Sequence, residues 1–357
     1  MTGWGTWARC ALAASSCGAI AVLAGCSAGT AATPTPTSPA SVTSSADPEG
    51  GSTGTAAKPT GSPGATGAVA PLTGLTVTAA TAQRPAVAVA VAGSDPVGLG
   101  SADLVFEEIT SPVRYLAVFQ SDQPGQVGPV TSTRPEDGPT LSVLHPLTSY
   151  DGGTSSFISV LDATKIIDDG YAEHASLYSA GSDGLTVSAA GLAAAGGSDG
   201  PPPPLFFYRT AGTSLASGQG TYPTSVRVDI PGQPVQQWDF DAHADRWVET
   251  AGGPRVSVAN LVVQIVAFKT VYLSRKYGET VPSAHVLGTG VATVFSGTAP
   301  GGSGGTAATG IWSKPGLAAV TNYLDAANQQ MSFAPGPTWI ILAPAGTRTS
   351  QVAGGRA

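Results

Sequence analysis

Four charged residues in the first half of the chain could form one polar site: Glu107, Arg114, Arg134 and Asp151. The segments 103–109 and 114–119 are predicted to be the two strands of a hairpin, in which Ile109 faces Arg114 and Glu107 is the diagonal neighbour of Arg114 on the same face. A carboxylate and a guanidinium at this spacing form a structural ion pair more often than a ligand site. The pair alone therefore predicts an ion pair at the end of a sheet.

Arg134 and Asp151 each lie in a loop between a predicted strand and a predicted helix. Thr133 and Glu136 have the spacing of a capping box, with Pro135 at the first helical position, so a helix should begin there and run to about residue 144. Backbone N–H groups in such a loop, together with an arginine, suit phosphate, sulfate or carboxylate. An equal alternative is that Arg134 only clamps a neighbouring loop.

The loop at Asp151 follows a predicted strand at 147–150 and precedes a predicted helix at 155–167. Two strand-to-helix loops at the carboxyl ends of strands commonly flank one crevice. We therefore predict that Glu107, Arg114, Arg134 and Asp151 line a single cleft, which would hold an anionic or peptide ligand. The hypothesis fails if the four side chains lie on different faces.

The sequence carries none of the common catalytic or metal-binding motifs. Glycine-x-serine-x-glycine occurs only in stretches of small residues, such as 50–54 and 301–305, without the strand-to-helix pattern of a catalytic elbow. There is no phosphate-binding glycine-lysine loop and no histidine-glutamate-x-x-histidine helix. A Ser-His-Asp triad stays open, because the chain has 4 histidines and many serines, but no residue is singled out for it. The string from Asp241 to Asp245, with His243 at its centre, falls between two predicted strands and is more typical of a solvated turn than of a metal site. We expect no cofactor and no metal.

The elements around these residues predict an α+β fold in two domains. Strands at 84–91, 103–109, 114–119 and 147–150 alternate with the two helices, which favours an N-terminal α/β-type domain over 72–200. From residue 222 onward nearly every segment has the pattern of a strand, which predicts a β-rich, mainly antiparallel C-terminal domain over 201–345. Four consecutive prolines at 201–204 mark the boundary, and residues 346–357 are predicted to be a disordered tail.

The start of the chain has the pattern of a lipoprotein export signal. Arg9 precedes a short apolar run that ends at Leu23-Ala24-Gly25-Cys26, where cleavage of the signal 1–25 leaves a cysteine that receives lipid. Residues 26–71 are mostly Thr, Pro, Ser, Gly and Ala, so they are predicted to form a disordered linker. The sequence therefore predicts a body held at the extracytoplasmic face of a cell membrane through Cys26.

The composition narrows the choice of partners. The formal net charge is −7, and an acidic chain with few lysines argues against nucleic acid as a partner. Cys10 and Cys17 leave with the signal and Cys26 is lipidated, so no disulfide is expected. The predicted partners are the membrane, through the lipid on Cys26, and a cell-wall polymer or another envelope protein.

Beyond these patterns, the sequence resembles the YerB-like lipoprotein family from about residue 72 to residue 344. The resemblance is carried by RPAVAVAV, SADLVFEE, VRYLAVFQSDQPGQVGPVTSTRPED, LTSYDGG, VLGTGVATVFSG, GIWSK and TNYLDAANQQMSFAPGPTWIILAP. It implies an exported lipoprotein with two domains of unknown function. The sequence departs from the family where Ser132-Thr133-Arg134 replaces serine-alanine-arginine, and where Ala175 stands at the family's histidine.

These observations leave three functions open. The first is a binding or scaffold protein of the cell envelope. The second is an envelope enzyme acting on a cell-wall glycan or phosphate ester, in which Arg114 and Arg134 stabilise phosphoryl charge while Glu107 or Asp151 takes a proton. The third is a spacer that docks another envelope protein through its sheet edges. The missing nucleophile and metal ligands favour the first over the second.

Overall fold

The computed structural model describes residues 67–353, apart from 94, 165, 198–199, 211–212, 217–220, 275 and 299–303. The predicted signal peptide, Cys26 and the linker as far as residue 66 lie outside the described residues. The described part begins with an antiparallel pair, β1 (Ala68–Val69) and β2 (Thr76–Val77), which starts a few residues before the predicted domain. No helix in this part of the chain is long and apolar enough to cross a membrane.

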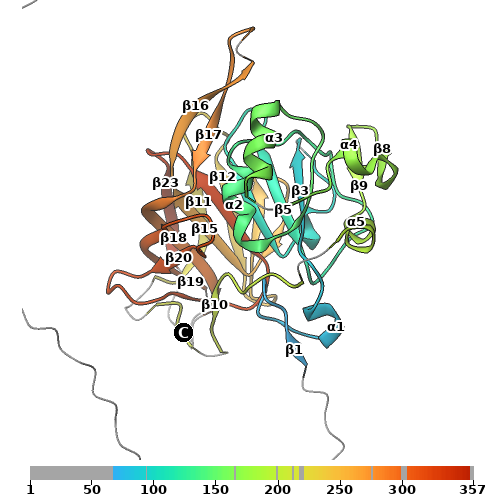
Figure 1. Ribbon diagram of the computed structural model, residues 1–357. Coiled ribbons are helices and arrows are strands. Elements are labelled where there is room, and N and C mark those ends of the chain that lie inside the picture. Colours follow the sequence, from blue (N-terminus) through green and yellow to red (C-terminus); the bar gives the residue numbers. More distant parts are fainter. Residues whose placement is uncertain are drawn as a thin grey trace, which may run out of the picture. The chain divides into compact units, whose positions relative to one another are not determined.

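A ten-stranded mixed sheet forms the centre of the described residues (Figure 1). Its strands, in order across the sheet, are β20 (Asn322–Leu324), β19 (Gly305–Lys314), β18 (Gly288–Thr298), β15 (Asn260–Ile265), β22 (Thr338–Ala343), β4 (Leu104–Glu108), β5 (Arg114–Phe119), β3 (Val87–Ala92), β6 (Leu147–Ser149) and β7 (Ile167–Asp168). Strand β22 is parallel to both of its neighbours, β15 and β4. The predicted segments 72–200 and 201–345 therefore contribute strands to one sheet.

The two faces of this sheet carry separate hydrophobic cores. Successive residues of a strand point to opposite faces, so Val105 and Tyr115 pack on one face while Leu104 and Leu116 pack on the other. All residues of β5 and β22 are buried, because both strands are covered on both sides. We call the face with Tyr115 the first face and the face with Leu116 the second.

A smaller antiparallel sheet covers the first face. Its five strands are β14 (Ser257–Val258), β13 (Arg246–Ala251), β12 (Gln236–Asp241), β11 (Pro223–Asp229) and β23 (Arg348–Ala353), in that order. Trp238 and Trp247 of this sheet are fully buried in the core between the two sheets. Helix α5 (Ala189–Ala195) adds Leu192 to the same core.

Helices cover the second face. Helix α2 (Asp137–Leu141), the 3-10 turn η2 (Ser142–Leu144) and helix α3 (Ser155–Asp162) bury Leu141, Leu144 and Leu161 in the second core. In Figure 1 α2 and α3 are the green helices in front of the cyan strands. The loops that precede α2 and α3 are the two loops in which the candidate site residues were predicted.

The other elements are short, except for one long hairpin. Strands β16 (Ala267–Ser274) and β17 (Glu279–His285) pair only with each other and form the orange hairpin that projects from the body in Figure 1. The short elements are α1 (Ala79–Ala82), η1 (Leu99–Ser101), α4 (Tyr171–His174), η3 (Ala175–Leu177), β8 (Tyr178–Ala180), β9 (Leu185–Val187), β10 (Phe207–Tyr208) and β21 (Ser332–Phe333).

The fold class agrees with the prediction: an N-terminal part that mixes helices and strands precedes a C-terminal part of mostly antiparallel strands. Three details differ. The helix expected to reach about residue 144 turns into a 3-10 turn after Leu141, and the one expected to reach residue 167 ends at Asp162. The predicted disordered tail contains β23, a polar strand at the edge of the smaller sheet.

Candidate functional site

Strands β4 and β5 pair in a register that differs by one residue from the predicted one. Glu108 faces Arg114 across the ladder, and Glu107 faces Tyr115. A shift of one residue turns a side chain to the other face of the sheet. The prediction that Glu107 and Arg114 share a face is therefore wrong, and Glu108 takes the place beside Arg114.

Glu107 is sealed between the two sheets. Its side chain is 2% exposed, Oε2 accepts a hydrogen bond from Trp339 Nε1 (2.7 Å) and Oε1 accepts one from Gln236 Nε2. Burial raises the pKa of Glu107 to about 7, although both hydrogen bonds act in the opposite direction. A carboxyl group in this position is out of reach of a ligand at the surface.

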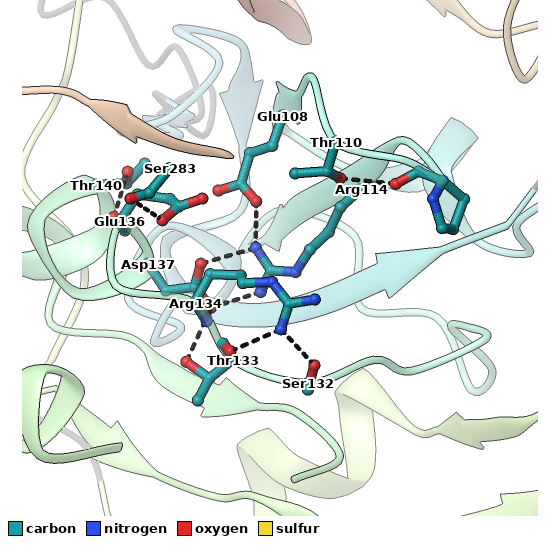
Figure 2. Close-up of polar contacts among 11 residues, drawn as sticks. Glu108, Thr110, Arg114, Ser132, Thr133, Arg134, Glu136, Asp137, Thr140 and Ser283 are labelled. Atoms are coloured by element: carbon teal, nitrogen blue, oxygen red, sulfur yellow. Dashed lines mark hydrogen bonds and ion pairs between the residues drawn. The ribbon is translucent and has the colours of Figure 1, made fainter. Parts of the chain in front are cut away.

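Arg114 is the centre of a buried ion cluster on the second face (Figure 2). Its Nη1 donates to Glu108 and to Asp137 Oδ1 (2.7 Å), and its Nη2 donates to Asp137 Oδ2 (2.5 Å). The three side chains are only 1 to 2% exposed. The last residue of β4, the first of β5 and the first of α2 thus meet in one ion pair network.

Glu136 extends this cluster toward the long hairpin. Its Oε2 accepts a hydrogen bond from Ser283 Oγ on β17 (2.7 Å), which ties the base of the hairpin to the start of α2. Burial raises the pKa of Glu136, and the neighbouring Asp137 charge raises it further. Ser283 and Glu136 are both buried, so the contact is closed to solvent.

The electrostatics of the cluster depend on Arg114. Burial raises the pKa of Glu108 well above its usual value, and the charge of Arg114 opposes this rise. Burial alone would lower the pKa of Arg114, but Asp137 and Glu108 raise it. Within this cluster and the neighbouring Arg134, four buried side-chain atoms have no hydrogen-bond partner among the described residues: Glu108 Oε1, Arg114 Nε, Arg134 Nε and Glu136 Oε1.

Asp137 organises the loop before α2 in place of the predicted capping box. Its Oδ2 accepts hydrogen bonds from Thr133 Oγ1 (2.9 Å) and from the backbone N–H of Arg134 (3.0 Å). The N–H of Thr133 donates to the carbonyl of Gly152 (3.0 Å). The N–H groups of Thr133 and Arg134, which were expected to receive an anion, are thus already used within the protein.

Arg134 lies beside Arg114 and is half-buried (Figure 2). Its Nη1 donates to Ser132 Oγ (2.7 Å) and to the carbonyl of Thr133 (3.3 Å). Burial lowers the pKa of Arg134, and the charge of Arg114 lowers it further. Arg134 thus contacts its own loop, rather than the neighbouring loop that the alternative predicted.

The two predicted strand-to-helix loops do lie side by side. The N–H of Asp151 donates to the carbonyl of Thr131 (2.9 Å), beside the bond from Thr133 to Gly152. The Asp151 side chain is exposed, however, whereas Arg114 is buried. Glu107 lies on the opposite face of the sheet, so the four residues do not line one cleft.

An open groove lies next to these loops. It has a volume of about 400 Å³ and is lined by Ala92, Gly93, Asp95, Pro112, Pro129, Val130, Thr131 and Asp183. Asp95 and Asp183 are exposed, and apolar side chains line the wall between them. One wall depends on Gly128, where a Cβ atom would lie 2.6 Å from the carbonyl oxygen of Leu185.

Sequence reasoning missed this groove. One sequence signal could have indicated the groove. The triplet Gly-Ser-Asp, which is typical of turns, occurs at 93–95 and at 181–183, where it ends in Asp95 and Asp183. Nothing in the sequence between them shows that these two turns meet in space.

The described residues include no group of three or more His, Cys, Asp or Glu side chains that could hold a metal ion. The string from Asp241 to Asp245 is an exposed turn between β12 and β13, as predicted. Asp241 Oδ1 accepts hydrogen bonds from the N–H groups of His243 (2.9 Å) and Ala244 (3.1 Å), which closes the turn.

Comparison with known proteins identifies both halves of the chain. Residues 72–183 match the N-terminal domain, and residues 226–340 the C-terminal domain, of a protein family of unknown function, DUF3048. The crystal structure of the YerB protein from Bacillus subtilis is similar, with a TM-score of 0.61 and 20% sequence identity over 80% of this chain and 100% of that chain. This similarity shows a shared fold. No curated protein matches the chain.

Proposed function

The chain belongs to the DUF3048 family, whose two domains it carries in order, and from this premise we propose that it is a membrane-tethered binding protein of the cell envelope. The tether is the lipid on Cys26, at the predicted cleavage site. If the linker is a coil, as its composition predicts, about 44 residues have a root-mean-square length of roughly 35 to 40 Å, which sets the height of the body above the membrane.

The observation that carries the binding role is the open groove beside a closed ion cluster. Arg114, Glu108 and Asp137 form ion pairs with one another out of solvent, which is typical of a structural cluster. The groove of about 400 Å³ has the size of a small-ligand site and is bounded by two exposed carboxylates. A ligand that fits it carries an ammonium group and an apolar part between the two carboxylates.

The ligand we propose is a cell-wall polymer that bears free amino groups. Its amines would pair with Asp95 and Asp183, and its backbone would contact Pro112 and Pro129. This replaces the anionic ligand expected from the sequence, because the N–H groups of Thr133 and Arg134 are occupied. The alternative enzyme is not favoured, since Glu107 and Arg114 are buried on opposite faces of one sheet.

The anchor is tested by changing Cys26 to alanine and fractionating cells of a bacterium that processes lipoproteins. We expect the wild-type protein and the control Cys17→Ala in the membrane fraction, and Cys26→Ala as a released protein or an uncleaved precursor. A processed Cys26→Ala protein that stays firmly in the membrane would show that the lipid is not the anchor.

The groove is tested by sedimentation of the protein with purified cell wall. We expect the wild-type protein to sediment, and the double variant Asp95→Asn/Asp183→Asn to lose about three- to thirtyfold in affinity, since each exposed ion pair contributes about 0.3 to 1 kcal/mol. Acetylating the wall amines should have the same effect.

The matched control removes two exposed carboxylates outside the groove, in Asp162→Asn/Asp229→Asn, and should bind as the wild type does. If the groove variant and the control bind equally, the proposed site is wrong. If the acetylated wall still binds, the partner is another component of the envelope.

A further inference from the structure

A second, smaller cavity surrounds Lys314 at the end of β19. It has a volume of about 30 Å³ and is lined by Phe106, Thr140, Val143, Leu205, Phe206, Gln264, Val286, Lys314, Thr321, Tyr323, Ile340 and Leu342. None of these residues lines the groove described above. Leu205 and Thr321 are only half-buried, so the cavity comes close to the surface there.

Lys314 is a buried cation without a carboxylate partner among the described residues. Its side chain is 3% exposed, and Nζ donates to the carbonyls of Ala319 (2.5 Å) and Leu317 (3.5 Å). Burial lowers the pKa of Lys314 to about 8. An ammonium group has three N–H donors, so one remains for a further acceptor.

Gln264 supplies a second donor to the same cavity. Its side chain is 4% exposed, and its Oε1 accepts a hydrogen bond from Tyr323 Oη (2.6 Å). Gln264 lines the cavity, and its amide nitrogen is not among the buried atoms that lack a partner, so this donor can reach the cavity space. An acceptor inside the cavity would give it a hydrogen bond.

The rest of the wall is apolar. Phe106, Val143, Phe206, Val286, Ile340 and Leu342 form half of the lining, from five different parts of the chain. A site with one cation, one amide donor and apolar walls selects an anion that has oxygen acceptors and a small apolar group. The volume exceeds the roughly 10 to 15 Å³ that a cavity needs to hold one water molecule, so a small polar group such as a carboxylate fits and a large ligand does not.

We propose that this cavity binds the carboxylate group of a small organic acid, with Lys314 and Gln264 as the donors. The alkyl part of the ligand contacts the apolar wall and extends toward Leu205 and Thr321. A carboxylate there supplies the negative charge that Lys314 lacks among the described residues. This site is separate from the proposed wall-binding groove, so either can fail without the other.

The proposal is tested on the full-length protein with acetate as the probe and acetamide as its neutral match, at constant ionic strength. The rate at which an amine-specific reagent labels Lys314 is measured by peptide mass spectrometry between pH 6 and 10. Bound acetate should raise the pKa of Lys314 by about one unit or more, which lowers its labelling rate at pH 8 by about fivefold or more. Acetamide should have no such effect.

Exposed Lys276 in the same sample serves as the internal reference, because it should label equally with acetate and acetamide. Lys314→Met should remove the acetate-dependent rise in melting temperature, while Lys269→Met should keep it. If acetate leaves the labelling profile of Lys314 unchanged, or protects Lys276 equally, the proposal is wrong. If Lys314→Met does not fold, the labelling profile of the wild-type protein still tests the proposal.

Discussion

At the scale of single residues, the charge of Arg114 sets the energetics of the closed cluster. Its guanidinium contacts Glu108 and Asp137 directly, and Glu136 lies beside them. Removing one partner of a buried ion pair leaves the other charge uncompensated in a medium of low polarity, which costs more than the pair contributes.

We therefore expect Arg114→Met to lower the free energy of unfolding by about 3 to 5 kcal/mol, measured by urea unfolding followed by tryptophan fluorescence. The control Arg227→Met, at an exposed position of β11, should change it by about 0.5 kcal/mol or less. Equal effects of the two substitutions would mean that the cluster contributes no more than a surface charge.

Glu107 should make stability depend on pH. Its pKa in the folded protein, about 7, lies above the unfolded value near 4.3, so the folded state binds the proton more tightly. The stabilising contribution is fully present below the unfolded pKa and is lost as the pH rises through 7. The loss should amount to about 3 kcal/mol between pH 4 and 8.

The measurement compares urea unfolding at several pH values for the wild type and for Glu107→Gln, which cannot titrate. The variant should show a flatter dependence on pH, whereas Glu279→Gln, at an exposed position of the hairpin, should keep the wild-type slope. An unchanged slope in Glu107→Gln would show that Glu107 does not titrate in this range.

The sequence predicted which residue types would gather, but not which glutamate would join them. Arg114, Arg134 and the loop at Asp151 were placed in neighbouring positions by the pattern of strands and helices. The choice between Glu107 and Glu108 depends on the register of the hairpin. Both faces of this strand are buried, so two adjacent acidic residues do not show which register is correct. The groove was missed because its aspartates lie far apart in the sequence.

At the scale of elements, the contact between β19 and β20 depends on a position without a side chain. Gly310 on β19 lies so close to β20 that a Cβ atom would be 1.9 Å from the carbonyl oxygen of Leu324. The backbone must therefore move if any side chain is added there.

We expect Gly310→Ala to lower the free energy of unfolding by about 1 to 3 kcal/mol, because overpacking at a rigid contact forces backbone shifts. Gly316→Ala is the matched control, since nothing lies within 4 Å of the added atom. Urea unfolding of both variants tests this prediction. An unchanged free energy of unfolding in Gly310→Ala would show that β20 is not held against β19.

Elements were predicted well where buried apolar positions mark a strand and poorly where nearly all side chains are exposed. Strands β5 and β22 are mostly apolar on both faces, a pattern typical of a strand covered on both sides, and β4 begins with three apolar residues. By contrast, β23 reads RTSQVA and is mostly exposed, so nothing in its hydrophobicity distinguishes it from a disordered tail. Its pairing with β11 depends on backbone hydrogen bonds, which leave no mark on the sequence.

At the scale of the whole molecule, β22 joins the two matched domains. It is parallel to β15 on one side and to β4 on the other, and all of its residues are buried. A fragment that lacks either neighbour leaves unpaired backbone groups at the edge of a strand whose residues are all buried in the complete sheet.

We therefore expect that neither 67–200 nor 201–357 folds when produced alone, whereas the two fragments produced together associate into a folded complex. Circular dichroism and gel filtration of each fragment and of the pair provide the measurement. A cooperative thermal transition in either isolated fragment would contradict the expectation and would show that the two family domains are independent folding units.

The position of β22 also determines when the central sheet can form during folding. The strand that fills the gap beside β4 is synthesised long after β4 itself, so contacts at the middle of the sheet join distant parts of the chain, which makes folding slow. For the export proposed above, which requires an extended polypeptide, this delay is an advantage. Under that proposal, we expect the chain to stay unfolded until β22 has crossed the membrane, and then to fold on the outer side.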